Sequence, residues 1–469
     1  MHREFWILGI VLTAPAVSAQ PTWITMQNEN FHVYSTSSER TTRDALNQFE
    51  RVRSFFLQLT GTAPDKSAPV SVVIFGSEKE YQPYRLNAFA TAYYSNLSDR
   101  DFIVVGRLGE ESSRIATHEY THLAFEHAGY SLPPWLNEGL AEFFSTLRPV
   151  GDDTEFGAVL DGRLQELNRA SWVPMETILT ADKNSPYYNE TNLAGSLYSQ
   201  SWAFVHMLAT TTKYRHKFWE VVDAVNNGTP SVQALETAYG VPFATLETEL
   251  KDYIQGNTFI KLKMKIKLDD TGKVAARPAD MIDVHEVQAE LLMGLHGRQA
   301  EARTRFEELA LEDAQRPEPW ANLGYLSWRD GKPAEAEEKF AKAYELGDRN
   351  PRLLLSYAQL AMQDKPGSST AALTALLELE PKNIEARLLL ANLQMSQGQF
   401  SEALVTARPI ASVRTADQRD DLLYLRAFAA MRLGDVAKAR SLAEELKKTS
   451  SSADYQARAD EILRISNER

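Results

Sequence analysis

Two histidines and a glutamate stand close together in the segment THEYTHLAFEHAG, Thr117–Gly129. His118 and His122 are four residues apart, so in a helix they lie on one face and their imidazoles can bind the same metal ion. Glu119, next to the first histidine, is placed to accept a proton from water activated by such an ion. A pair of surface histidines beside an ordinary helix glutamate gives the same pattern, so the choice between the two interpretations depends on the residues after Gly129.

A second helix supplies a third candidate ligand. After Gly129, a residue type that commonly ends helices, the chain reads YSLPPWLNEGLAEFF. The two prolines end one element and can open the next, and the short connection makes the helices antiparallel neighbours. This brings Glu138 opposite the histidines. Two neutral imidazoles and one carboxylate form a three-ligand zinc site with its fourth position open to water. We therefore expect one zinc ion per chain, held by His118, His122 and Glu138.

The paired motifs HEYTH and WLNEGLAEF resemble those of the gluzincin metallopeptidases, and most closely the bacterial peptidase-MA-like domains. The resemblance covers about Asn30–Gly256. It implies that His118, His122 and Glu138 bind zinc and that Glu119 is the general base. Fifteen residues separate the second histidine from the glutamate ligand, a few fewer than in thermolysin and the aminopeptidases. No G-x-M-E-N-like segment precedes the motif, so the resemblance implies a peptidase without supporting aminopeptidase activity.

Four further residues are candidates for the site or its surroundings. Glu142 lies one helical turn after the glutamate ligand and could hold His118, because ligand histidines usually have such an outer partner; a solvated helix charge is the alternative. By resemblance, Tyr198 matches a tyrosine that stabilises the transition state, and a buried aromatic residue would fit nearly as well. His206 could be a second oxyanion donor, but a hydrogen-bonded core histidine is the more frequent case. His127 falls off the ligand face and is interpreted as structural.

The composition is that of a globular protein with two or three domains. The chain has 469 residues, of which 43% are hydrophobic and 24% are charged. The net charge of −13 argues against general nucleic-acid binding. There is no cysteine, which excludes disulfides, thiol catalysis, cysteine–zinc sites and a lipidated cysteine.

The N-terminal segment MHREFWILGIVLTAPAVSAQ reads as a signal peptide, residues 1–19, that is cut before Gln20. A retained anchor is the alternative. No later segment approaches membrane-spanning length. We therefore expect an exported protein, either in a bacterial periplasm or secreted.

The first half of the chain reads as strands followed by helices, the order of an α+β domain. Alternating apolar residues predict strands at Asn30–Thr36, Val70–Gly76 and Asp101–Gly106, with an amphipathic helix between a start signal at Ser38 and a stop at Gly61. Helices are then expected in the HEYTH segment and in PPWLNEGLAEFFSTL, SLYSQSWAFVHMLATT, KFWEVVDAVNNG and FATLETELKDYIQG. The segment IKLKMKIKL, Ile260–Leu268, alternates without a break and precedes a turn at residues 269–272. It predicts an edge strand whose lysines discourage aggregation, with a basic docking patch as the alternative.

From about Asp283 the chain repeats with a period of 34 residues. The unit Pro317–Asn350 carries Trp, Leu, Gly, Ala and Phe at spacings that recur in its neighbours. This helix-turn-helix period resembles the tetratricopeptide repeat, and we expect about five units, of which Pro351–Asn383 is the least regular. Stacked helix pairs form a curved solenoid that suits protein or peptide partners. The predicted fold is thus an α+β gluzincin-like metallopeptidase domain (20–257), a strand-like linker (258–282) and an all-α tetratricopeptide-repeat solenoid (283–469).

The leading hypothesis is an exported zinc metallopeptidase with repeats for protein or peptide binding. One alternative is a non-catalytic gluzincin-like scaffold that presents the repeats to a partner. Glu119 argues against it, because a scaffold needs no general base. A non-haem iron oxygenase with two histidines and a carboxylate is the other alternative, and the helical H-E-x-x-H spacing disfavours it.

Overall fold

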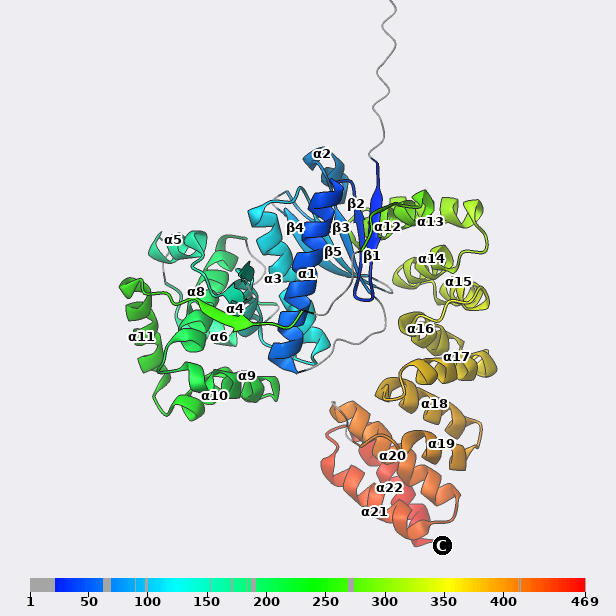
Figure 1. The fold of residues 1–469 in the computed structure, drawn as a ribbon. Coiled ribbons are helices and arrows are strands. Elements are labelled where there is room, and N and C mark those ends of the chain that lie inside the picture. The colour runs from blue at the N-terminus through cyan, green and yellow to red at the C-terminus, as the bar shows by residue number, and fades with distance from the viewer. Residues whose placement is uncertain are drawn as a thin grey trace, which may run out of the picture.

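The computed structural model describes residues 22–61, 69–88, 90–97, 100–151, 153–169, 172–182, 184–186, 191–268, 274–411, 413 and 415–468, without the side chains of 191–194. The expected signal peptide and the turn at 269–272 lie outside these residues. An N-terminal part, built on a sheet and a group of helices, is followed by a long array of helix pairs (Figure 1).

A six-stranded sheet forms the first core of the N-terminal part. Its strand order is β4-β5-β3-β2-β1-β9, with β2, β3 and β5 parallel and β4 antiparallel to β5. The three strands expected from the sequence are β2, β3 and β5, whereas β1, β4 and β9 were not expected. The bounds are β1 Ile24–Gln27, β2 Phe31–Ser35, β3 Val70–Ile74, β4 Ala92–Leu97, β5 Arg100–Val105 and β9 Arg277–Pro278.

Helix α1, Glu39–Thr60, covers one face of this sheet together with α3, Glu110–His127. The expected bounds of α1 are confirmed. The side chain of Ser38 accepts a hydrogen bond from the backbone of Thr41 and caps the first turn. Gly61 ends the helix in the left-handed region at φ +66°, which glycine adopts without a Cβ penalty. The short α2 (Glu78–Tyr81) and the 3-10 helix η1 (Gln82–Tyr84) come after β3.

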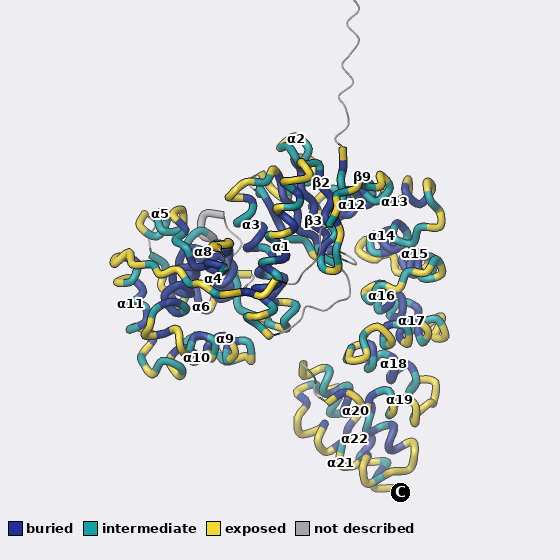
Figure 2. The backbone as a smooth tube through the Cα atoms, viewed as in Figure 1, coloured by how far each residue is buried: buried dark blue, intermediate teal, exposed yellow. Residues whose placement is uncertain are grey.

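Helix α12, Met281–Gly294, covers the opposite face of the sheet. Val284, Val287 and Leu291 are buried there against side chains from β2, β3, β4 and β5. In Figure 2 the strands and the neighbouring α12 are mostly buried. The first helix of the repeat array therefore completes the core of the sheet.

The second half of the N-terminal part is mostly helical and packs beside α3. It contains α4 Pro134–Phe144, α5 Asp161–Arg169, α6 Met175–Thr180, α8 Thr191–Thr210, η2 Arg215–Lys217, α9 Phe218–Asn226, α10 Ser231–Tyr239 and α11 Phe243–Gly256. A second sheet has the order β6-β7-β8, with β6 Arg148–Val150, β7 Asp153–Phe156 and β8 Leu262–Lys265. The lysine-rich segment Ile260–Leu268 thus contributes an edge strand, as predicted, but the strand is limited to Leu262–Lys265.

The array consists of five helix pairs in the described residues, closed by α22 Ala453–Asn467. The pairs are α12 with α13 Gln299–Glu312, α14 Pro317–Arg329 with α15 Pro333–Glu345, α16 Pro351–Ala361 with α17 Pro366–Leu379, α18 Ile384–Ser396 with α19 Phe400–Ala407, and α20 Ala416–Arg432 with α21 Val436–Thr449. Gly324 allows the helices of one pair to approach, since a Cβ there would lie 2.6 Å from the ring of Phe340. No helix among the described residues is long and apolar enough to cross a membrane.

Candidate metal centre

The HEYTH segment lies in the second half of α3, as the sequence predicted. The helix begins after Gly109, whose backbone N–H donates to the hydroxyl of Ser112 at 2.8 Å. It ends at His127, and Gly129 lies just beyond in the left-handed region at φ +83°. The chain then turns through a double proline, and α4 begins at Pro134, where the missing N–H costs no helical hydrogen bond.

Helix α4 is held close to α8 by a glycine next to the third candidate ligand. A Cβ at Gly139 would lie 2.6 Å from Cγ2 of Val205 and 2.8 Å from the backbone oxygen of Ser201. Only glycine therefore permits this approach of the two helices. The approach fixes α4 so that Glu138, which is 3% exposed, points toward α3.

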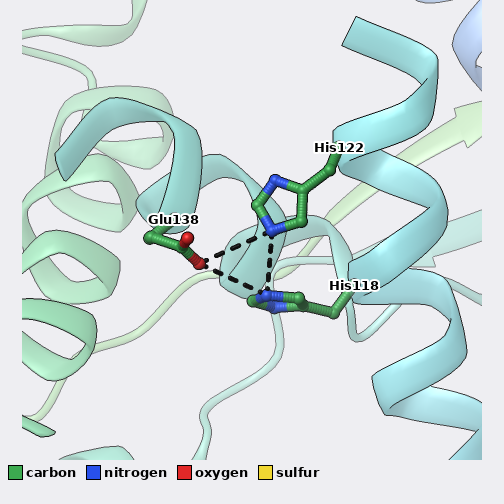
Figure 3. A group of neighbouring side chains, drawn as sticks. All are labelled: His118, His122 and Glu138. Atoms are coloured by element: carbon green, nitrogen blue, oxygen red, sulfur yellow. Dashed lines mark hydrogen bonds and ion pairs between the residues drawn. The ribbon is translucent and has the colours of Figure 1, made fainter. Parts of the chain in front are cut away.

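His118, His122 and Glu138 face one another with their ligand atoms in a triangle (Figure 3). The two Nε2 atoms are 3.2 Å apart, and Oε2 of Glu138 lies 3.4 Å from Nε2 of His118 and 3.5 Å from Nε2 of His122. Ligands about 2.0–2.1 Å from a tetrahedral zinc ion are separated by roughly 3.3 Å along each edge. The three distances fit one face of such a tetrahedron, so the donor set and its spacing both suit zinc.

The protonation of the triangle shows how strongly these groups interact. Burial raises the pKa of Glu138, but hydrogen bonds with His118 and His122 outweigh this effect and hold the pKa well below its usual range. Burial lowers the pKa of His122, but the hydrogen bond and charge of Glu138 outweigh it and raise the pKa to about 9. The side chain of Asn137 adds a smaller contribution in the same direction. The triangle thus attracts positive charge, in the form of a proton or a metal ion.

Glu119 lies beside the triangle at the edge strand β4. Burial raises the pKa of its carboxyl group above the usual range. The neighbouring histidines and a hydrogen bond from the backbone of Tyr94 in β4 partly counteract this effect. A carboxyl group with a raised pKa is suited to take up and release a proton.

Glu142 faces the other nitrogen of the first histidine. Its Oε1 atom lies 3.8 Å from Nδ1 of His118, while the carboxylate is 2% exposed. Two guanidinium groups hold it in place: Nη1 of Arg114 is 3.2 Å from Oε2, and Nε of Arg163 is 3.2 Å from Oε1. The buried carboxylate is therefore paired on two sides and fixed behind the histidine.

Tyr198 lies against the same histidine from α8. Its ring centroid is 6.4 Å from that of His118, and the guanidinium of Arg163 lies 5.0 Å above the tyrosine ring. On the next residue, the hydroxyl of Ser199 donates to Glu166 of α5 at 2.6 Å. Arg163 of helix α5 therefore contacts both the ring of Tyr198 and the buried carboxylate of Glu142.

Two other histidines, His206 and His127, have polar partners outside the triangle. The ring nitrogens of His206 lie 2.9 Å from the backbone oxygen of Gly157 and 2.8 Å from the hydroxyl of Tyr253. Burial lowers the pKa of His206 to about 4, so its ring is neutral in the core. His127 lies 3.1 Å from the carboxylate of Asp101 at the end of α3. Neither ring belongs to the triangle.

The structure also adds residues that sequence reasoning did not find. Arg114 stands one turn before His118 and could have been suspected from its position on α3. Arg163 comes from α5, a helix without fully buried residues that packs against α8. Its role depends on the tertiary fold, and the sequence contains no signal for it.

Comparisons with known proteins concern the repeats. A family model described as a tetratricopeptide repeat matches residues 363–419. A search of curated proteins finds no match. Among solved structures, YrrB, described as a tetratricopeptide-repeat protein with an unusual peptide-binding site, is 17% identical; the match covers 38% of this chain and 90% of that one, with a TM-score of 0.34.

Two further solved structures have similar values. The pilF protein of Pseudomonas aeruginosa is 18% identical, with 38% of this chain and 82% of that chain covered and a TM-score of 0.30. A tetratricopeptide-repeat protein from Parabacteroides merdae is 17% identical, with 55% and 100% covered and a TM-score of 0.25. The family match and the stacked helix pairs agree with the 34-residue period. The C-terminal region of the chain is thus a helical solenoid that contains tetratricopeptide repeats, a repeat type that suggests a protein or peptide partner.

Proposed function

We propose that the protein is an exported zinc metallopeptidase of the gluzincin type, with repeats that bind protein or peptide partners. The observation that carries this proposal is the triangle of His118, His122 and Glu138, whose edges of 3.2, 3.4 and 3.5 Å suit one tetrahedral zinc ion. Three ligands occupy one face of a tetrahedron, which leaves its fourth corner for water. Glu119 stands next to the ligands and is partly buried.

Each side chain has a distinct role in this proposal. When bound, zinc supplies Lewis acidity, which makes water more acidic and polarises a peptide carbonyl group. Glu119 accepts the proton of the attacking water and delivers it to the leaving amine. Its raised pKa supports this role, because a carboxyl group with an ordinary pKa is a poor proton donor near neutral pH.

Outer residues keep the site in its reactive geometry. Glu142 orients His118 from behind and is itself fixed by Arg114 and Arg163. Tyr198, beside the same histidine, is the candidate donor to the oxygen of the peptide carbonyl as negative charge develops on it. Such a donor acts in the transition state more than in the bound substrate.

A non-catalytic scaffold is the second candidate function. It is favoured by the repeats, since residues 363–419 carry the family match and the repeat type suggests a protein or peptide partner. In a scaffold, the triangle would have a structural role at most, and Glu119 would be dispensable. An experiment that removes the metal and then adds it back distinguishes a peptidase from a scaffold.

The test is to treat purified protein with a chelator, supply zinc again, and follow a broad peptide library by mass spectrometry at each stage. The proposed peptidase cleaves peptides before treatment, loses cleavage with the metal and regains it with about one zinc per chain. A scaffold cleaves nothing at any stage. Recovery of activity with iron alone would contradict the zinc assignment.

A further inference from the structure

The end of strand β4 meets the solenoid directly. Nη1 of Arg352, on α16, donates to the backbone oxygen of Leu97 at 2.5 Å. Helix α12 packs on the same strand so closely that a Cβ at Gly294 would lie 2.8 Å from Cδ2 of Leu97 and 3.3 Å from Oγ of Ser95. The two contacts fix the repeats relative to this strand.

A second arginine lies at the same place. Nη1 of Arg329, at the end of α14, donates to the backbone oxygen of Met293 at 3.3 Å, and Met293 precedes the glycine that touches β4. The side chains of Arg329 and Arg352 are both exposed, and neither forms an ion pair with any described residue. By contrast, Arg100, which also lies at the sheet, forms ion pairs with Glu286 and Glu290.

The surroundings of Arg329 and Arg352 suit a polypeptide partner. Trp328, next to Arg329, is a large apolar side chain that remains 36% exposed. Helices α14 and α16, which carry the two arginines, lie on the side of the solenoid that faces the N-terminal part, whereas α15 and α17 lie on the outer side (Figure 1). Exposed aromatic and arginine side chains are enriched in surfaces that bind proteins.

This end of β4 is also close to the candidate metal centre. The backbone of Tyr94 hydrogen-bonds to Glu119, and Leu97 comes three residues later in the strand. Three residues of extended chain span about 10 Å. Strand β4 is the last strand of the sheet in the described residues and pairs with β5 on one side only. Its other edge can pair with an added extended segment.

From this arrangement we infer that Arg329 and Arg352 bind acidic side chains of an extended polypeptide that runs along β4 from the metal centre to the solenoid. The inference rests on the proposed function and adds a substrate class to it: polypeptides with an acidic residue about three or four residues from the cleaved bond. Neither guanidinium forms an ion pair with a described residue, although the charge of Arg352 acts on Asp101 from a longer distance, so both can bind an added carboxylate. The unpaired backbone edge of β4 favours a polypeptide over a nucleic acid as the occupant, because it can form backbone hydrogen bonds with another extended chain.

The experiment measures binding in the full-length Glu119→Gln chain, so that no cleavage interferes. The probes are two labelled peptides, one of alternating alanine and glutamate and the other of alternating alanine and glutamine, followed by fluorescence anisotropy. We expect the glutamate peptide to bind about tenfold more tightly, a difference of about 1.4 kcal/mol, and to lose the advantage in high salt. Hydrogen exchange of β4 should slow when this peptide binds.

Substitution of both arginines by glutamine should abolish the preference for the glutamate peptide. Arg408→Gln is the matched control, because Arg408 is an exposed arginine that caps α19, away from β4, and it should leave the preference intact. The charge-reversed variant with Arg329→Glu and Arg352→Glu should instead prefer a peptide of alternating alanine and lysine. Unchanged melting temperatures confirm that the variants are folded.

Three results would overturn the inference: equal binding of the two peptides, a preference that survives removal of both arginines, or a single-stranded oligonucleotide that displaces the glutamate peptide and binds more tightly. Failure of the proposed function would give different results from failure of this inference. If the wild-type chain cleaves no peptide while the arginine-dependent binding is observed, the peptidase assignment fails and the binding surface stands. If it cleaves peptides without regard to acidic residues near the cut, the peptidase stands and the inference fails.

Discussion

Oε1 of Glu142 lies 3.8 Å from Nδ1 of His118, whose other ring nitrogen is 3.4 Å from Glu138. The imidazole is therefore placed between two carboxylates that stand one turn apart on α4. One carboxylate belongs to the candidate metal triangle, and the other faces the ring from behind, where we propose that it orients the imidazole. The orienting carboxylate is in turn held by Arg114 and Arg163, so the geometry of the site extends beyond its ligands.

Glu142→Gln should weaken zinc binding. The amide keeps the shape but removes the negative charge that orients His118, and such outer partners typically contribute 10–100-fold in metal affinity. Competition with a fluorescent chelator measures the dissociation constant. Glu166→Gln is the control, since Glu166 also lies near Arg163, at 3.6 Å, without facing the histidine. Equal zinc affinity of the Glu142 variant and wild type would remove Glu142 from the site.

Tyr198→Phe should lower kcat and leave zinc content and KM nearly unchanged. The ring beside His118 is retained, so packing is preserved, while the hydroxyl that would stabilise the developing oxyanion is lost. Loss of one such donor typically costs about 10²–10³ in kcat. Steady-state kinetics on any peptide that the wild type cleaves provides the measurement. A variant with wild-type turnover would make Tyr198 a packing residue.

The parts of the site that the sequence predicted are those governed by local spacing. His118 and His122 share a helix face because they are four residues apart, and the short proline turn limits where Glu138 can lie. Arg163 reaches the site from α5, and its position depends on how α5 packs against α8, which no local pattern reveals. The same reasoning explains the sheet: the apolar strand β3 was evident, whereas the edge strand β4, AYYSNL, carries polar residues on its exposed positions and lacks a clear period.

Removal of the whole repeat region should destabilise the N-terminal part. Helix α12 buries Val284, Val287 and Leu291 against the sheet, and burial of each such side chain contributes about 1.5–3 kcal/mol. The sum is comparable to the stability of an ordinary domain. A chain that ends at residue 257 should therefore aggregate or melt at a much lower temperature, whereas one that ends at residue 315, after α13, should stay folded. Equal melting temperatures of the two truncated chains would show that α12 is dispensable.

Acid should destabilise the protein through His206. Its pKa is about 4 in the folded chain and about 6.5 when unfolded, so between these values the unfolded chain binds a proton that the folded chain does not. Stability is thus lost as the pH falls from about 6.5 to 4, by about 2 kcal/mol between pH 7 and pH 5.

Urea unfolding of wild type and His206→Gln at these two pH values isolates this contribution, because His32, whose pKa is also lowered to about 4, is present in both proteins. The glutamine variant should be less stable at pH 7 and should lose less stability on acidification. An identical loss in both proteins would show that His206 does not cause the pH dependence.

Glu119 is the general base of the proposed zinc peptidase, and metal content and cleavage measured together in Glu119→Gln test this role. Wild type and variant are purified without chelators, analysed for metals, and incubated with the same peptide library. We expect about one zinc per chain in both proteins and cleavage by the wild type only, because the amide keeps the shape of Glu119 and cannot accept the proton of water. Cleavage by the glutamine variant at the wild-type rate, with zinc bound, would contradict this role.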